Sequence, residues 1–200
     1  MTLALPPARP FRLADHLESL VWVMPTRTGV DLHELHLLLT PGGSLPQAEI
    51  AGTELSLATA SREAAQRAVL LSGAAGVELR WTERMSAGRH RHASSFVAGT
   101  GEHVQRLLRL ARHGAGLDIG DAAAPVVWRA AVLACSRVRT GDGSLTIRFP
   151  TAQRAATARA AAQHLGLAAV TEPPTRGELR HRVRLEPGET ALLVSNLLGR

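Results

Sequence analysis

Lysine and tyrosine are absent from this sequence, and cysteine occurs once. The lone thiol of Cys135 cannot form an internal disulfide, so we expect a reducing, cytoplasmic setting. Three Trp and three Phe are too few for the stacking platforms that bind single-stranded nucleic acid. The apolar runs are short, and the N-terminus has no basic start, so we expect neither a membrane-spanning helix nor a secretory signal.

Basic residues are plentiful, and all 23 of them are Arg. The formal net charge is +6, against 17 acidic residues. Because Arg contacts phosphate in a bidentate way, this excess is typical of a phosphate-binding surface. It also fits a general bias toward Arg, Ala, Gly and Leu, and composition alone favours that second interpretation.

The hydrophobic pattern predicts helices alternating with strand pairs in a chain of 200 residues, 45% of them hydrophobic. Ser61 and Thr151 are expected N-caps, and Gly166 is expected to close a helix. The expected helices are 11–24, 31–39, 61–71, 101–111, 126–138, 151–166 and 188–198. The expected strands lie near 54–58, 77–82, 92–98, 145–149, 167–172 and 178–186.

An internal repeat divides the chain into two similar parts. The segment 54–61 aligns with 144–151, since each is a strand that runs into a capped helix. We therefore predict an α+β fold with antiparallel sheets that carry helices on one face and are open on the other. A single domain, 1–200, would contain halves at about 25–114 and 125–200, after an N-terminal helix at about 11–24.

Arginines recur on the predicted open face. Because side chains alternate across a strand, Arg180, Arg182 and Arg184 should point the same way. Such a row could follow the phosphates of duplex DNA. An ordinary solvated face is the alternative, because nearby glutamates dilute the pattern. The candidate DNA-binding residues are Arg80, Arg84, Arg89, Arg91, Arg148, Arg180, Arg182 and Arg184.

The histidines do not form a metal motif. His33 and His36 are three residues apart, whereas the zincin motif places its two histidines four apart. His90 and His92 have no neighbouring Cys or carboxylate, and a zinc site needs three or four ligands. We find no nucleophile with a base and an orienting group. We therefore predict no metal, no cofactor and no catalytic residue.

Four segments resemble the N-terminal domain of the WhiA family, the sporulation and cell-division transcription regulators of Gram-positive bacteria. They occur in the family's order and span most of the chain. They are Pro25–Leu45, with Pro-Thr-Arg-Thr and Gly-Gly-Ser-Leu; Val127–Ala134, read as VWRAAVLA; Gln163–Ala169, read as QHLGLAA; and Leu192–Gly199, read as LLVSNLLG.

The resemblance implies the fold of LAGLIDADG homing endonucleases, in which two pseudo-symmetric αββαββα halves form a saddle on duplex DNA. The metal-binding acids of those nucleases would fall at Gly42 and Cys135, and neither supplies a carboxylate. We therefore expect a protein that is not an enzyme, binds double-stranded DNA and acts in transcription regulation. The resemblance also implies a C-terminal helix-turn-helix domain after a linker, and since this sequence reaches Arg200, where that linker would begin, we expect a protein without that domain. The alternative is a protein-interaction module that pairs with a full-length regulator or another transcription factor.

Overall fold

The computed structural model describes residues 11–25, 28–51, 53–85, 93–117, 120–134, 143–174 and 179–199. Its elements, in chain order, are η1 (Leu13–His16), α1 (Leu17–Val21), α2 (Thr28–Leu39), β1 (Ala48–Ala51), β2 (Glu54–Thr59), α3 (Arg62–Ala74), β3 (Arg80–Met85), β4 (Ala93–Gly99), α4 (Gly101–Ala115), η2 (Gly120–Ala122), α5 (Ala123–Ala134), β5 (Leu145–Phe149), α6 (Ala152–His164), β6 (Ala169–Glu172), β7 (His181–Leu185) and α7 (Pro187–Leu198).

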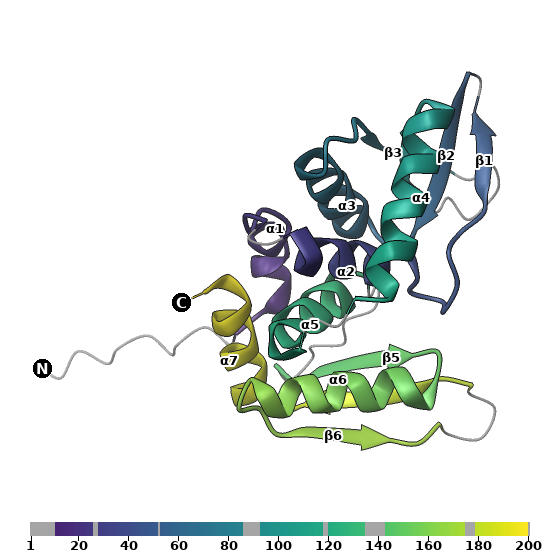
Figure 1. Ribbon diagram of the computed structural model, residues 1–200. Helices are drawn as coiled ribbons and strands as arrows, with labels where there is room; N and C mark the ends of the chain where they lie inside the picture. The colour runs from purple at the N-terminus through teal and green to yellow at the C-terminus, as the bar shows by residue number, and fades with distance from the viewer. Residues whose placement is uncertain are drawn as a thin grey trace, which may run out of the picture.

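Two antiparallel sheets organise the chain, as the sequence predicted. The first has the strand order β1-β2-β4-β3, and the second has the order β5-β7-β6. In Figure 1, α4 lies in front of the first sheet and α6 in front of the second, with α2 and α5 between them. Each sheet thus has helices on one face. In the described part, one strand separates α5 from α6, and residues 135–142 lie outside the description.

Helix α5 shows how the two parts share one core. Trp128 is fully buried, and its Nε1 donates a hydrogen bond to the Ala158 carbonyl of α6 at 2.9 Å. Leu35 of α2, Leu57 of the first sheet and Ile147 of the second belong to the same apolar cluster. In the described part of the chain, no helix is long and apolar enough to cross a membrane.

The predicted helix caps are confirmed. Ser61 Oγ accepts a hydrogen bond from Ala64 N at 3.0 Å, and Thr151 Oγ1 accepts one from Arg154 N at 3.2 Å. These bonds satisfy backbone donors that the first turn of a helix leaves unpaired. Gly166 follows α6 with a φ of +73°, a conformation that favours glycine.

Several predicted boundaries were wrong. The strand expected at 77–82 starts only at Arg80, because Val77 N donates to Ser72 O at 2.9 Å and so completes the end of α3. The helix expected at 11–24 is a 3-10 turn followed by the short α1, which ends at Val21. The last predicted strand is shorter and spans 181–185. Strand β1 was not predicted at all.

Candidate nucleic-acid interface

On the open face of the first sheet, the described arginines lie beside glutamates. Arg80 forms an ion pair with Glu54 of β2. Arg84 Nη1 lies 3.8 Å from Glu49 Oε2, and Arg84 Nη2 donates to Ser56 Oγ at 2.9 Å. These two arginines are candidate site residues that β3 does place on one face. Their charge, however, is matched by carboxylates of the same sheet.

The open face of the second sheet is more positive. Arg148 of β5 lies directly opposite Arg182 of β7, and Arg184 lies two residues farther along β7. Arg182 Nη1 is 4.0 Å from Glu172 Oε2, and Arg184 Nε is 3.4 Å from Glu186 Oε1. Three arginines and these two glutamates therefore lie close together at this part of the described sheet.

Of the other candidate arginines, the structure describes Arg180 but not Arg89 or Arg91. Arg180 is exposed and precedes β7, which begins at His181, so it extends the row just beyond the strand. Arg89 and Arg91, together with His90 and His92, lie outside the described residues.

The ends of the two central helices are held by the opposite half of the chain. Arg154, in the first turn of α6, donates through Nη1 to the Thr40 carbonyl and through Nη2 to Thr40 Oγ1 at 2.9 Å. In the other direction, the N-cap Ser61 of α3 donates to the Leu133 carbonyl near the end of α5. Burial lowers the pKa of Arg154. These contacts between helix ends of opposite halves were not predictable from local sequence, because they join residues more than 70 positions apart.

Of the positions expected to correspond to the nuclease acids, the structure describes one. Gly42 lies in an exposed turn three residues beyond α2, and Cys135 lies outside the described residues. Thr40, directly after α2, is the residue that Arg154 binds.

A buried ion triad joins α2, α3 and α5. Glu34, which is inaccessible to solvent, accepts hydrogen bonds from Arg67 Nε at 2.9 Å and from Arg129 Nε at 2.7 Å. Burial raises the pKa of Glu34, but the hydrogen bonds and charges of Arg129 and Arg67 outweigh it, so the pKa is lowered. In the sequence, Glu34 and Arg129 are charged residues within largely apolar helices, which is a sign of a buried ion pair. Their spacing in the sequence does not show that they pair with each other.

His36 of α2 lies between the two halves. Its pKa is lowered by burial, by the charge of Arg154 on α6 and by His33, whereas a hydrogen bond with the backbone of Ala111 on α4 raises it. Within the described ranges, no three His, Cys, Asp or Glu side chains are grouped so that they could hold a metal ion. The carboxylate of Glu34, two residues before His36, is already bound by Arg67 and Arg129.

No protein-family model matches this sequence. No curated protein matches it either. Solved structures of similar fold include two of WhiA and one of a homing endonuclease. Full-length WhiA from Thermatoga maritima aligns with a TM-score of 0.64 at 12% identity, over 94% of this chain and 62% of that one. This chain therefore spans less than two thirds of the full-length WhiA chain.

The N-terminal LAGLIDADG domain of WhiA aligns with a TM-score of 0.62 at 12% identity, covering 98% of this chain and 94% of that domain. The homing endonuclease I-DmoI, in a complex with DNA and Mn, aligns with a TM-score of 0.57 at 10% identity, over 87% of this chain and 99% of that one. At such identities the likeness establishes the fold alone. The chain has a mixed fold of two antiparallel sheets covered by helices, that of the LAGLIDADG homing endonucleases.

Proposed function

We propose that this chain is a non-catalytic protein that binds duplex DNA through the open faces of its sheets. The observation that carries the proposal is the row of Arg148, Arg182 and Arg184 on one sheet face. The fold supports it, because I-DmoI of the same fold is in a complex with DNA. We expect these arginines to contact mainly phosphates, so the binding is salt-dependent and largely independent of sequence.

The proposed lack of cleavage rests on the ends of the central helices. Cleavage with divalent metals needs carboxylates that hold the ions. Thr40 follows α2, and the guanidinium of Arg154 is bound to it. A cation at this place repels a metal ion. Gly42 and Cys135, the positions expected for the two nuclease acids, are not carboxylates either.

The WhiA likeness supports a role in transcription regulation of sporulation or cell division. In that role the chain occupies DNA without cutting it. The same likeness supports membership of the WhiA family, because this chain aligns with 94% of the LAGLIDADG domain of WhiA.

The test is fluorescence anisotropy with a labelled duplex of about 20 base pairs over a range of salt concentrations. Replacing Arg148, Arg182 and Arg184 by Ala should reduce the slope of log K against log salt by about 2 to 3, since each phosphate contact contributes about 0.9. The matched control is Glu172→Gln, which removes the carboxylate beside Arg182 and should strengthen binding.

Two results would overturn the proposal. If no binding occurs at low salt, or if binding does not weaken as salt rises, the arginines do not contact DNA phosphates. Nicking of plasmid DNA with magnesium or manganese would show that the chain is a nuclease after all.

A second candidate function is a protein-interaction module that pairs with a full-length regulator or another transcription factor. The observation in its favour is that Trp22 and Met24, just after α1, are 57% and 74% exposed. Exposed aromatic and Met side chains are enriched at protein interfaces. A stoichiometric partner that remains after nuclease treatment, and is lost in Trp22→Ser, would favour this function.

A further inference from the structure

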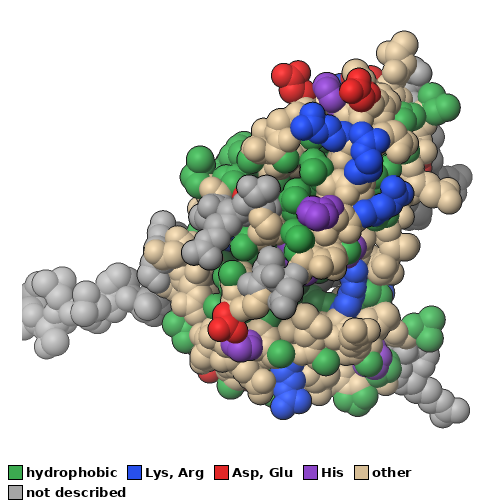
Figure 2. All heavy atoms as spheres, viewed as in Figure 1, with side chains coloured by type: hydrophobic (Ala, Val, Ile, Leu, Met, Phe, Trp, Pro, Cys, Tyr) green, Lys and Arg blue, Asp and Glu red, His purple; other side chains and the backbone are tan. Residues whose placement is uncertain are grey.

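The solvent face of α4 carries a row of arginines. Arg106, Arg109 and Arg112 are exposed and follow each other at intervals of three residues. With a rise of 1.5 Å per residue, the row is about 9 Å long. Figure 2 shows the basic side chains gathered along this helix. In the part of the chain that the structure describes, no carboxylate forms an ion pair with these three arginines.

The row continues across the junction between the halves. Arg154 at the start of α6 donates to Thr40 just after α2, and a hydrogen bond between His33 and the Gly114 carbonyl joins α2 to the end of α4. Helix α6 carries the exposed Arg159 and contains no acidic residue. Figure 2 shows further basic side chains below α4, toward α6. The positive surface thus extends over both halves on the helix-covered side.

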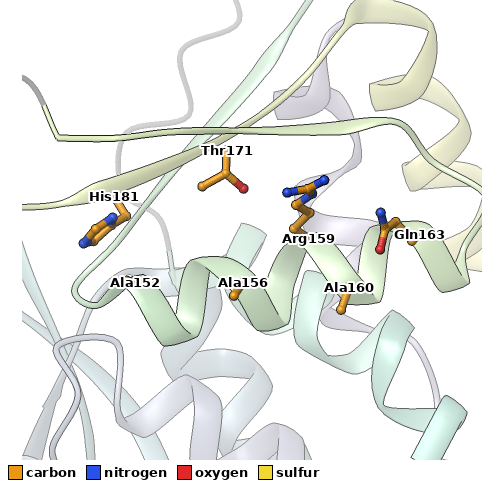
Figure 3. Close-up of a pocket in the computed structure, with 7 residues that line it drawn as sticks. All are labelled: Ala152, Ala156, Arg159, Ala160, Gln163, Thr171 and His181. Atoms are coloured by element: carbon orange, nitrogen blue, oxygen red, sulfur yellow. The ribbon is translucent and has the colours of Figure 1, made fainter.

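A shallow groove lies between α6 and the strands of the second sheet. Its volume is about 360 Å³, and its lining includes Ala156, Ala160, Arg159, Gln163 and Thr171. In Figure 3 the side chains of Arg159 and Gln163 extend from α6 toward the strand that carries Thr171. The small alanines permit close approach of another backbone, and the three polar side chains are of the types that contact phosphate oxygens.

The helix-covered face differs from the sheet faces in two ways. On the sheets, Arg80, Arg84, Arg182 and Arg184 each lie within ion-pair distance of a carboxylate. Also, none of the exposed large apolar side chains in the described part of the chain lies on α4 or α6. Protein interfaces have an apolar centre, whereas DNA interfaces are more polar and more positive. The chemistry of this face therefore favours nucleic acid over protein.

We propose that the helix-covered face, through Arg106, Arg109, Arg112 and Arg159, binds the phosphate backbone of a second DNA duplex. One molecule then bridges two DNA segments, with one on the sheet faces and one on the helices. This inference rests on the proposed function for its first duplex. Arg154 positions the end of α2 and contributes charge to the row.

The test is capture of a labelled duplex by an immobilised, unlabelled duplex in the presence of the full chain. Replacing Arg106, Arg109, Arg112 and Arg159 by Gln should reduce capture at least tenfold. Binding to the immobilised duplex alone should change less. Glu102→Gln, which removes the acidic residue of the first turn of α4, should increase capture. Circular dichroism and melting temperature check that each variant is folded.

The outcomes separate this inference from the proposed function. If the chain binds the immobilised duplex but captures no second one, the bridging is overturned and the sheet-face function stands. If binding of a single duplex is lost in the α4 and α6 variant but kept when Arg148, Arg182 and Arg184 are replaced, the helix-covered face binds DNA and the sheet-face function is overturned.

Two further outcomes would also overturn the bridging. Capture that rises with the square of protein concentration would show that two molecules bridge the duplexes. Retention on polyglutamate without capture of DNA would show that the face binds an acidic protein segment.

Discussion

At the scale of single residues, Glu34 joins the central helices. It lies on α2 and accepts hydrogen bonds from Arg129 on α5, so a buried ion pair connects the two halves of the chain. Arg67 supplies the second cation from α3.

We predict that Glu34→Gln lowers the free energy of unfolding by about 3 to 5 kcal/mol, since it leaves two buried guanidinium groups without a counter-charge. Urea denaturation at neutral pH measures this loss. The control is Glu54→Gln, which breaks the solvent-accessible pair with Arg80 and should cost at most about 1 kcal/mol. Equal losses in the two variants would contradict a special role for the buried triad.

At the scale of elements, α2 and α4 pack unusually closely at Gly114. A Cβ added there would be 2.0 Å from the Leu32 carbonyl oxygen, which is far inside van der Waals contact. His33 Nδ1 lies 3.0 Å from the Gly114 carbonyl, so a hydrogen bond joins the helices at the same point. The glycine is therefore required by the approach of two backbones.

We predict that Gly114→Ala destabilises the protein by at least about 2 kcal/mol, because a backbone contact cannot yield as a flexible side chain can. Gly73→Ala is the matched control, since a Cβ at Gly73 of α3 would meet nothing within 4 Å. The control should stabilise the helix by about 0.5 to 1 kcal/mol. Melting temperatures of the two variants should move in opposite directions, and a shift of both in the same direction would contradict this packing.

The helices and strands also show which structural features a local sequence pattern can predict. The caps at Ser61 and Thr151 were predictable, because a side chain that caps a helix acts on residues three positions away. Strand β1 was missed, because its four residues, Ala48–Ala51, have almost no hydrophobic alternation of their own. Its pairing with β2 is a local hairpin, in which Ala51 lies opposite Glu54 and Ala48 lies opposite Leu57, so the pattern was too weak although the partners are close in sequence.

At the scale of the whole molecule, the two halves share their interior. The apolar cluster runs from Leu57 in the first sheet to Val183 in the second. Arg154 binds Thr40, and Ser61 binds the Leu133 carbonyl, so each half completes a helix end of the other. Separating the halves would expose α2 and α5 together with the buried Glu34.

We predict that the full chain unfolds in a single cooperative transition. Differential scanning calorimetry should give a calorimetric enthalpy equal to the van't Hoff enthalpy. Arg154→Ala should lower the melting temperature and keep the transition single, because the shared core remains. Two separate transitions in the unchanged chain would show that the halves fold independently.

The candidate site was partly predictable at this scale. The alternation of Arg180, Arg182 and Arg184 placed them on one side of the chain, and the register adds that Arg148 lies opposite Arg182. The glutamates beside these arginines come from other strands or from beyond the strand end, so their neutralising effect depends on tertiary pairing. The basic row on α4 was present at helical spacing, but only the fold shows that it continues to α6.

The sequence by itself determined the local features: the caps, the turns, the strand and helix types and the repeat, because these depend on residues close together in the chain. It also determined the absence of lysine and the excess of arginine. Only the tertiary structure decided which arginines face carboxylates and which do not, and which helix ends meet across the two halves. The physical reason is that charge and close packing act through space, and partners such as Glu34 and Arg129 are 95 residues apart.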